Sequence, residues 1–174
     1  PQTLGHEMSG IVDAIGEGVS AVSVGDHVAV SPLISCGECE WCKSGYPQLC
    51  EKLGYLGLMG DGGFAEYMVV PQENCVKAPE SLPLEHLAFG ELMAVTVHAI
   101  HQSGLKKGDR VAVVGGGPVG QLVAQVAKIF GASKVFLSEV AEGRLKVAQE
   151  VGAAVAINPE KENFVEVVKA ATNG

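Results

Sequence analysis

The sequence of 174 residues lacks an apolar run long and uninterrupted enough to cross a membrane. Its most apolar stretch, residues 111–130, is broken by glycines, Pro118 and Lys128. Near Pro1 there is no basic region followed by an apolar segment, so no targeting signal is visible. These absences argue against a membrane-spanning protein and predict one that is soluble and cytoplasmic.

Basic residues are also scarce, because 12 Lys and Arg stand against 20 Asp and Glu and give a formal net charge of −8 at pH 7. A chain with this charge repels phosphates, which argues against nucleic-acid and anionic-membrane partners. We find no internal repeat and no low-complexity tract. The 47% hydrophobic and 18% charged residues instead predict a packed core.

The first half of the chain is predicted to be rich in β-structure. Short apolar runs at residues 9–15, 27–30 and 67–70 are separated by turns that contain glycine and proline, which is typical of short strands. Residues 84–102 are predicted to form a connecting helix.

The second half is predicted to alternate between strand and helix. Strands are expected at residues 111–114, 135–138 and 155–157, and helices at residues 118–130, 144–150 and 164–171. This βαβαβα order is half of a doubly wound parallel sheet. The fold class is therefore α/β, with a partial β-rich domain at residues 1–97 and a partial Rossmann-type domain at residues 98–174.

Four of the five cysteines fall within fifteen residues in the spacing C-x2-C-x2-C-x7-C, namely Cys36, Cys39, Cys42 and Cys50. An odd total with one tight cluster indicates a metal site in a reducing compartment rather than a disulfide framework. Two-residue gaps let a tight turn present neighbouring thiolates to one structural zinc ion. An iron–sulfur cluster is the alternative, but no Cys-Pro pair ends the run. Cys75 stands alone and is expected to be an inert buried thiol.

A glycine-rich turn directly follows the predicted strand at residues 111–114 and has the pattern G-x-G-x-x-G. Such a turn, between a strand and a helix, is typical of dinucleotide binding. The first glycine permits the tight turn, the second lets the backbone approach a pyrophosphate, and the third allows close packing of helix and strand. The predicted coenzyme contacts are Gly115, Gly117, Pro118, Val119 and Gly120.

Glu139 ends the next predicted strand, where a carboxylate that binds ribose hydroxyls is expected. A carboxylate there would repel a 2′-phosphate, so we predict NAD rather than NADP. Arg144 lies nearby in the sequence and weakens this preference, and it is included among the coenzyme contacts. The alternative interpretation of Glu139 is a solvated surface acid.

The His6-Glu7 pair and Glu91 are weak evidence for a functional site when each is considered alone. A pair such as His6-Glu7 near a chain end is most often a solvated turn. Glu91 could be a helix-surface acid, but its neighbours are strongly apolar, and a buried acid needs a partner.

Taken together, the cysteine run, the glycine-rich turn and Gly5-His6-Glu7 resemble the zinc-dependent medium-chain alcohol dehydrogenases. Glu91 aligns with a glutamate in the stretch Glu-Pro-Leu-Ala-Val-x-x-His-Ala of the butanediol and sorbitol (polyol) branch, although this chain departs from it at Leu92 and Met93. The segment of residues 58–67 also resembles this branch and is interpreted as structural, with Phe64 and Tyr67 in the core.

The resemblance implies a GroES-like catalytic domain joined to the Rossmann-type domain. It implies a catalytic zinc site that includes His6, Glu7 and Glu91, and hydride transfer from a secondary alcohol or polyol to NAD. It further implies a homo-oligomer, a dimer or tetramer, for the intact protein. Family members carry further segments on both sides of this region, so we expect an internal piece that is inactive alone. The alternative is a non-catalytic zinc- or nucleotide-binding module.

Overall fold

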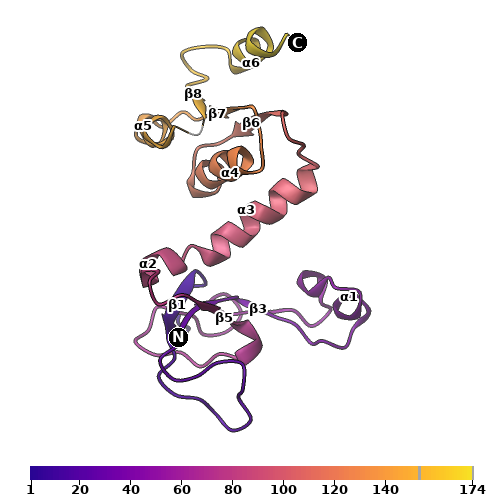
Figure 1. Cartoon of the computed structure of the whole chain (residues 1–174), viewed down its shortest axis with the longest axis vertical. Coiled ribbons are helices and arrows are strands. Elements are labelled where there is room, and N and C mark those ends of the chain that lie inside the picture. The colour runs from indigo at the N-terminus through magenta and orange to yellow at the C-terminus, as the bar shows by residue number, and fades with distance from the viewer. Residues whose placement is uncertain (153, 174) are drawn as a thin grey trace. The chain divides into compact units, whose positions relative to one another are not determined.

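The computed structural model of the chain describes residues 1–152 and 154–173 (Figure 1). The chain divides into two compact units, Pro1–Leu92 and Met93–Gly174. No helix in these described ranges combines the length and the apolar character needed to cross a membrane.

The centre of the first unit is an antiparallel sheet of three strands in the order β1-β2-β5, formed by Met8–Ile11, His27–Val30 and Cys75–Ala78. Met8 pairs with Val30, which pairs in turn with Cys75. Every second side chain of β2 faces the core, as the two-residue period of a strand requires. The buried residues of this core are Met8, Val22, Val28 and Val30.

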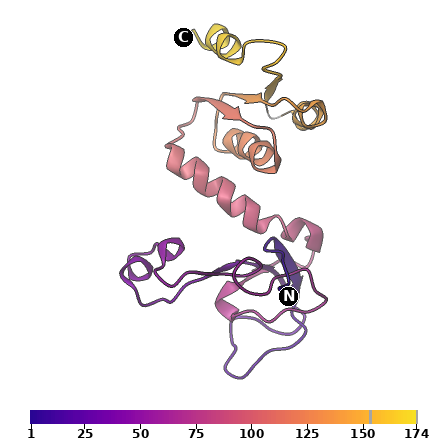
Figure 2. The same cartoon turned by 180° about the vertical axis from the view of Figure 1, so that it is seen from behind.

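A lobe projects from this unit on a two-stranded ribbon of β3 (Leu33–Ile34) and β4 (Gly54–Tyr55), as Figures 1 and 2 show. The lobe contains the short helix α1 (Glu40–Lys43) and the 3₁₀ turn η1 (Pro47–Leu49), neither of which has a buried residue. A second 3₁₀ turn, η2 (Gln72–Asn74), leads into β5. The lobe therefore has almost no apolar core of its own.

Two helices replace the single connecting helix predicted at residues 84–102. α2 (Leu84–Leu87) ends in a turn at Ala88 and Phe89, and α3 (Gly90–Ser103) follows it. α2 packs against the sheet of the first unit, and a Cβ on Gly90 would lie only 3.2 Å from the Cβ of Ala29. The chain turns at this close approach, so the prediction of one continuous helix was wrong.

The predicted strand at residues 67–70 was also wrong, because the segment has no strand partner in the described part of the chain. Its pattern was misleading because Met68 and Val70 do pack against the core of the first unit while their neighbours face outward. Phe64 and Tyr67, predicted to be in the core, are 80% and 75% exposed. Alternating burial alone cannot reveal whether a strand finds a partner.

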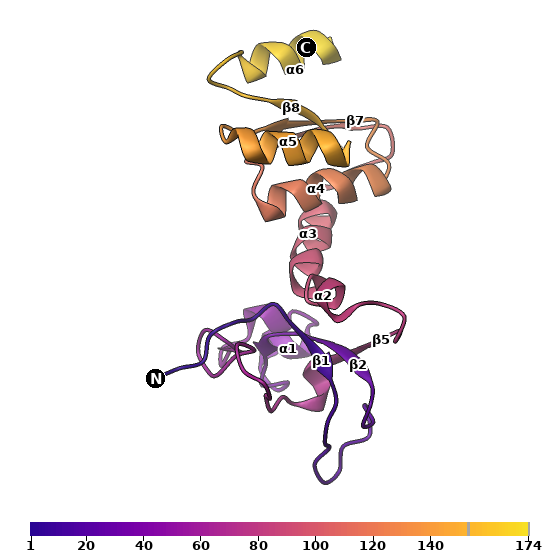
Figure 3. The same cartoon turned by 90° about the vertical axis from the view of Figure 1, so that its left-hand side faces the viewer.

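The second unit has three parallel strands in the order β6-β7-β8. Its elements in chain order are β6 (Arg110–Val114), α4 (Pro118–Ile129), β7 (Lys134–Ser138), α5 (Glu142–Val151), β8 (Val155–Ile157) and α6 (Phe164–Thr172). α4 and α5 cover one face of the sheet and α6 lies on the other (Figures 1 and 3). The predicted βαβαβα order and doubly wound fold class are confirmed.

Both faces of β7 are buried, as expected for a central parallel strand. Val135 and Leu137 point into a core shared with Val113 and α4, while Phe136 lies on the opposite face. α4 begins at Pro118, whose missing N–H costs nothing at a helix start. It ends before Gly131, which has the positive φ of 98° that glycine tolerates best.

Candidate metal and nucleotide sites

The four clustered cysteines converge in the lobe of the first unit. Cys36 follows β3, Cys39 caps α1, Cys42 lies within α1 and Cys50 ends η1. All are free thiols, and their sulfur atoms lie within 4.8 Å of one another. The Cys36–Cys42 and Cys39–Cys42 sulfur distances are 3.9 and 3.5 Å. A tetrahedral zinc with Zn–S bonds of about 2.3 Å needs sulfur separations of about 3.8 Å, so the donor set fits that ion.

Backbone amides favour thiolates at this cluster. The N–H of Cys39 donates to the sulfur of Cys36 at 3.4 Å, and the N–H groups of Cys36 and Lys52 donate to Cys50 at 3.3 Å. The backbone N–H groups of Glu38 and Cys39 lower the pKa of Cys36 to about 6, whereas burial raises the pKa of Cys42 to about 11. A cation would offset the cost of ionising the partly buried Cys42 thiol.

A second group of donor atoms forms from residues far apart in the sequence. One ligand atom from each of His6, Glu7 and Glu91 lies within 4.8 Å of the other two. His6 and Glu7 immediately precede β1, and Glu91 lies in the first turn of α3. One imidazole and two carboxylates can hold a divalent cation, and this set has fewer ligands than a closed four-thiolate site.

Tyr55 contacts two members of this group, and no motif or spacing in the sequence pointed to it. Its hydroxyl donates to Glu91 Oε1 at 3.1 Å, and its ring meets the His6 imidazole edge-on with centroids 5.6 Å apart. Burial, followed by the negative charge of Glu91, raises the pKa of Tyr55 to about 12. The phenol therefore remains a hydrogen-bond donor at physiological pH.

Three glycines let the backbone pack closely beside His6. The N–H of Gly63 donates to the carbonyl of Gly5 at 2.9 Å. A Cβ placed on Gly57 or Gly62 would overlap the same Gly5 carbonyl oxygen. The glycine-rich segment, which was predicted to be structural, thus packs against the backbone just before β1, where His6 lies.

Substitution of Gly62 by alanine is expected to lower the unfolding free energy of the first unit by about 1–3 kcal/mol, because the new methyl overlaps backbone that cannot rotate away. Gly60→Ala is the matched control, since its Cβ would meet nothing within 4 Å. Urea unfolding followed by the fluorescence of Trp41, the single tryptophan, measures both. Equal midpoints for the two variants would contradict the packing argument.

The predicted nucleotide turn has the expected geometry in the second unit. Gly115 has a φ of 97°, and Gly117 caps α4, whose first residue is Pro118. A Cβ on Gly120 would overlap the Gly115 carbonyl oxygen, so glycine is required for the close contact of turn and helix. Val119 lies in the first turn of α4 and is 44% exposed. The free amides at this helix start can meet a phosphate.

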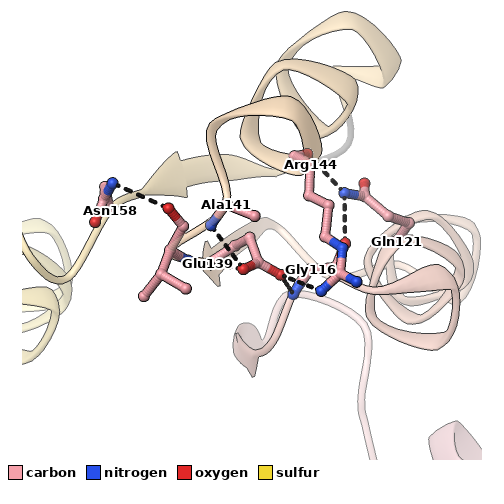
Figure 4. A network of polar contacts seen from close by, with 7 residues as sticks. Gly116, Gln121, Glu139, Ala141, Arg144 and Asn158 are labelled. Atoms are coloured by element: carbon pink, nitrogen blue, oxygen red, sulfur yellow. Dashed lines mark hydrogen bonds and ion pairs between the residues drawn. The ribbon is translucent and has the colours of Figure 1, made fainter.

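Glu139 is buried, with 7% of its surface exposed, so it is not a solvated surface acid. Its carboxylate accepts the N–H groups of Gly116, Val140 and Ala141 at 2.8–2.9 Å and lies 3.4 Å from the guanidinium of Arg144 (Figure 4). These donors, Ala141 foremost, lower the pKa of Glu139. The carboxylate is thus held ionised at the end of β7, directly against the glycine-rich turn.

Gln121 ties the turn to the helix that follows β7, and sequence reasoning missed it. Its amide donates to the carbonyl of Gly116 at 3.1 Å and to that of Arg144 at 2.9 Å (Figure 4). A polar residue on an otherwise apolar first turn of α4 was the available signal. The bond to Arg144 helps to fix the start of α5 beside Glu139.

Two family models match the chain. The alcohol dehydrogenase GroES-like domain matches residues 1–80, and the zinc-binding dehydrogenase domain matches residues 118–174. D-xylulose reductase A of Aspergillus oryzae is 40% identical over 167 residues, which are 95% of this chain and 47% of that protein. (R,R)-butanediol dehydrogenase of Saccharomyces cerevisiae is 39% identical over 189 residues, with 99% of this chain and 49% of that protein covered.

A solved structure has the same arrangement of elements. A zinc-binding dehydrogenase from Sinorhizobium meliloti, bound to NADP, superposes with a TM-score of 0.91 at 40% identity and covers 95% of this chain and 48% of its own. The present chain spans about half the length of the curated relatives it matches.

Proposed function

The chain belongs to the zinc-binding medium-chain alcohol dehydrogenases, and on this premise we propose that its protein is a zinc-dependent oxidoreductase that transfers hydride from a secondary alcohol or polyol, of the 2,3-butanediol or sorbitol kind, to NAD. The relatives named as a xylulose reductase and a butanediol dehydrogenase support the polyol class. Because the chain spans about half of their length, the activity is proposed for the protein as a whole.

The observation that carries the proposal is the presence of two donor groups of different kinds in one unit. Four cysteine sulfurs form a set that a single zinc ion would close, which suits a structural role. His6, Glu7 and Glu91 form a smaller nitrogen and oxygen set that leaves room for a substrate oxygen. We assign catalysis to the second group and support of the lobe to the first.

When bound, zinc supplies a Lewis acid that favours loss of the alcohol proton, and the nicotinamide accepts the hydride. The protein's own contribution is to hold the donors and the coenzyme. Tyr55 orients Glu91 through a hydrogen bond. His6 lies just before β1, next to backbone that packs closely against glycines. The amides at the start of α4 would hold the pyrophosphate, and the turn at Gly117 would let it approach the backbone.

Glu139 supports NAD as the coenzyme. Its ionised carboxylate can accept hydrogen bonds from ribose hydroxyls, and it would repel a 2′-phosphate. Arg144, which could attract such a phosphate, is paired with Glu139. The Sinorhizobium relative was solved with NADP, so coenzyme choice is tested separately from the reaction class.

The test is to express the complete reading frame that encodes this sequence and to measure coenzyme reduction with 2,3-butanediol, sorbitol and threonine. We expect alcohol-dependent NADH formation, with kcat/KM for NAD at least about 10-fold above that for NADP, equivalent to about 1.4 kcal/mol. A Glu139→Gln variant should have a smaller ratio of kcat/KM for NAD to kcat/KM for NADP. A fully zinc-loaded protein that turns over no alcohol would refute the proposed function.

A further inference from the structure

Tyr55 contacts two of the three donors in the His6–Glu7–Glu91 group. Its hydroxyl bonds to Glu91 across 36 residues of sequence, and its ring edge meets His6. Among the side-chain hydrogen bonds of the described residues, this is the one that holds the Glu91 carboxylate. A single side chain therefore couples a carboxylate on α3 to an imidazole at the entry to β1.

Tyr55 is itself firmly held. It is the last residue of β4 and pairs with Leu33 of β3. Its carbonyl accepts the N–H groups of Leu58 and Met59 at 3.2 and 2.8 Å. The backbone that carries the phenol is therefore fixed on both sides, so the ring reaches Glu91 and His6 from a defined position in β4.

The hydrogen bond and the ring contact restrict different motions. The hydroxyl hydrogen-bonds to Oε1 of Glu91 and so restricts rotation of the carboxylate. The second carboxylate oxygen does not take part in this hydrogen bond. The ring limits rotation of the His6 imidazole. Hydrogen-bond partners that orient metal ligands in this way usually contribute about 10- to 100-fold to metal affinity.

We propose that Tyr55 is a positioning residue that holds Glu91 and His6 in the arrangement that binds a divalent metal ion. This inference rests on the metal group of the proposed function and adds to it a residue that acts through two of the donors, Glu91 and His6. Tyr55→Phe keeps the ring and removes the hydroxyl, so it isolates the contribution of the hydrogen bond to Glu91. Tyr55→Leu removes both contacts.

The test is a cobalt titration of the 174-residue chain after the four cysteines have been filled with zinc. Co²⁺ bound by nitrogen and oxygen donors absorbs visible light but lacks the intense near-ultraviolet band of a cobalt–thiolate complex. The appearance of that band would therefore reveal cobalt that has replaced zinc at the cysteines. We expect the wild type to bind Co²⁺ at the second group, Tyr55→Phe to bind it about 10-fold more weakly, and Tyr55→Leu about 100-fold more weakly. Tyr67→Phe, whose side chain is exposed, is the matched control and should bind as the wild type.

The outcomes separate the two proposals. Wild-type binding at the second group with an equal affinity in Tyr55→Phe would overturn the positioning role and leave the metal group standing. A wild type that binds no cobalt there would overturn both. In a parallel sample with cobalt at both sites, the thiolate band reports whether each variant retains the folded lobe. A variant with an unchanged thiolate band and a lower Co²⁺ affinity at the second group supports the positioning role of Tyr55.

Discussion

Replacement of Cys39 by serine is expected to remove the tightly bound zinc and to unfold the lobe of residues 36–50. Among residues 35–53, only Cys50 is buried, so the lobe has almost no apolar core that could hold it without a metal. Structural zinc sites of this kind supply folding free energy directly, on the order of 10–16 kcal/mol of binding in isolated peptides. We expect about one tightly held zinc per wild-type chain, at the four cysteines, and an affinity of that site for zinc at least about 100-fold lower in Cys39→Ser.

Cys75→Ser is the matched control for this substitution. Cys75 lies in β5, outside the cluster, and its sulfur lies 3.8 Å from the carbonyl of Pro71. This variant should keep its zinc. Elemental analysis gives the zinc content, and amide hydrogen exchange of residues 36–50 reports the fold of the lobe. Full zinc content or undiminished protection in Cys39→Ser would contradict the structural role of the cluster.

Gly117→Ala is expected to weaken dinucleotide binding strongly while leaving the second unit folded. A Cβ on Gly117 would meet nothing within 4 Å, and the residue does not have a positive φ, so alanine fits the free protein. The new methyl would occupy the space through which a pyrophosphate approaches the backbone. We expect coenzyme affinity to fall by at least about 100-fold, equivalent to about 2.7 kcal/mol, in calorimetric titrations with NAD.

Gly120→Ala provides the contrast. Its Cβ would overlap the Gly115 carbonyl oxygen, so this variant should lose thermal stability as well as coenzyme affinity. Gly143→Ala, on α5 with no atom near its Cβ, should change neither. If Gly117→Ala bound NAD as tightly as the wild type, the turn would not be the phosphate site.

Local patterns predicted the second unit well. The strand predicted at residues 111–114 is Arg110–Val114, and the one predicted at residues 155–157 is Val155–Ile157. Buried parallel strands and amphipathic helices have distinct periods, and glycine and proline mark where one gives way to the other. The convergence of the cysteines was equally predictable, because ligands separated by two residues meet through a local turn.

Features that depend on distant partners were not predictable in this way. Residues 67–70 alternate as a strand does, but a strand requires a partner that the pattern does not specify. The approach of Glu91 to His6 followed from family resemblance rather than from residue spacing, and metal binding at this group stays a prediction. The contacts of Tyr55 could not be predicted from any sequence motif, because they form only where β4, α3 and the residues before β1 come together in the fold.

Direct hydride transfer from an alcohol to NAD is the central step of the proposed function. The most direct measurement uses the protein from the complete reading frame with a secondary alcohol that carries deuterium at its carbinol carbon, followed by mass analysis of the reduced coenzyme. We expect one deuterium in each reduced coenzyme formed, and no coenzyme reduction by a His6→Ala variant. Reduced coenzyme without deuterium, or unchanged turnover in His6→Ala, would contradict it.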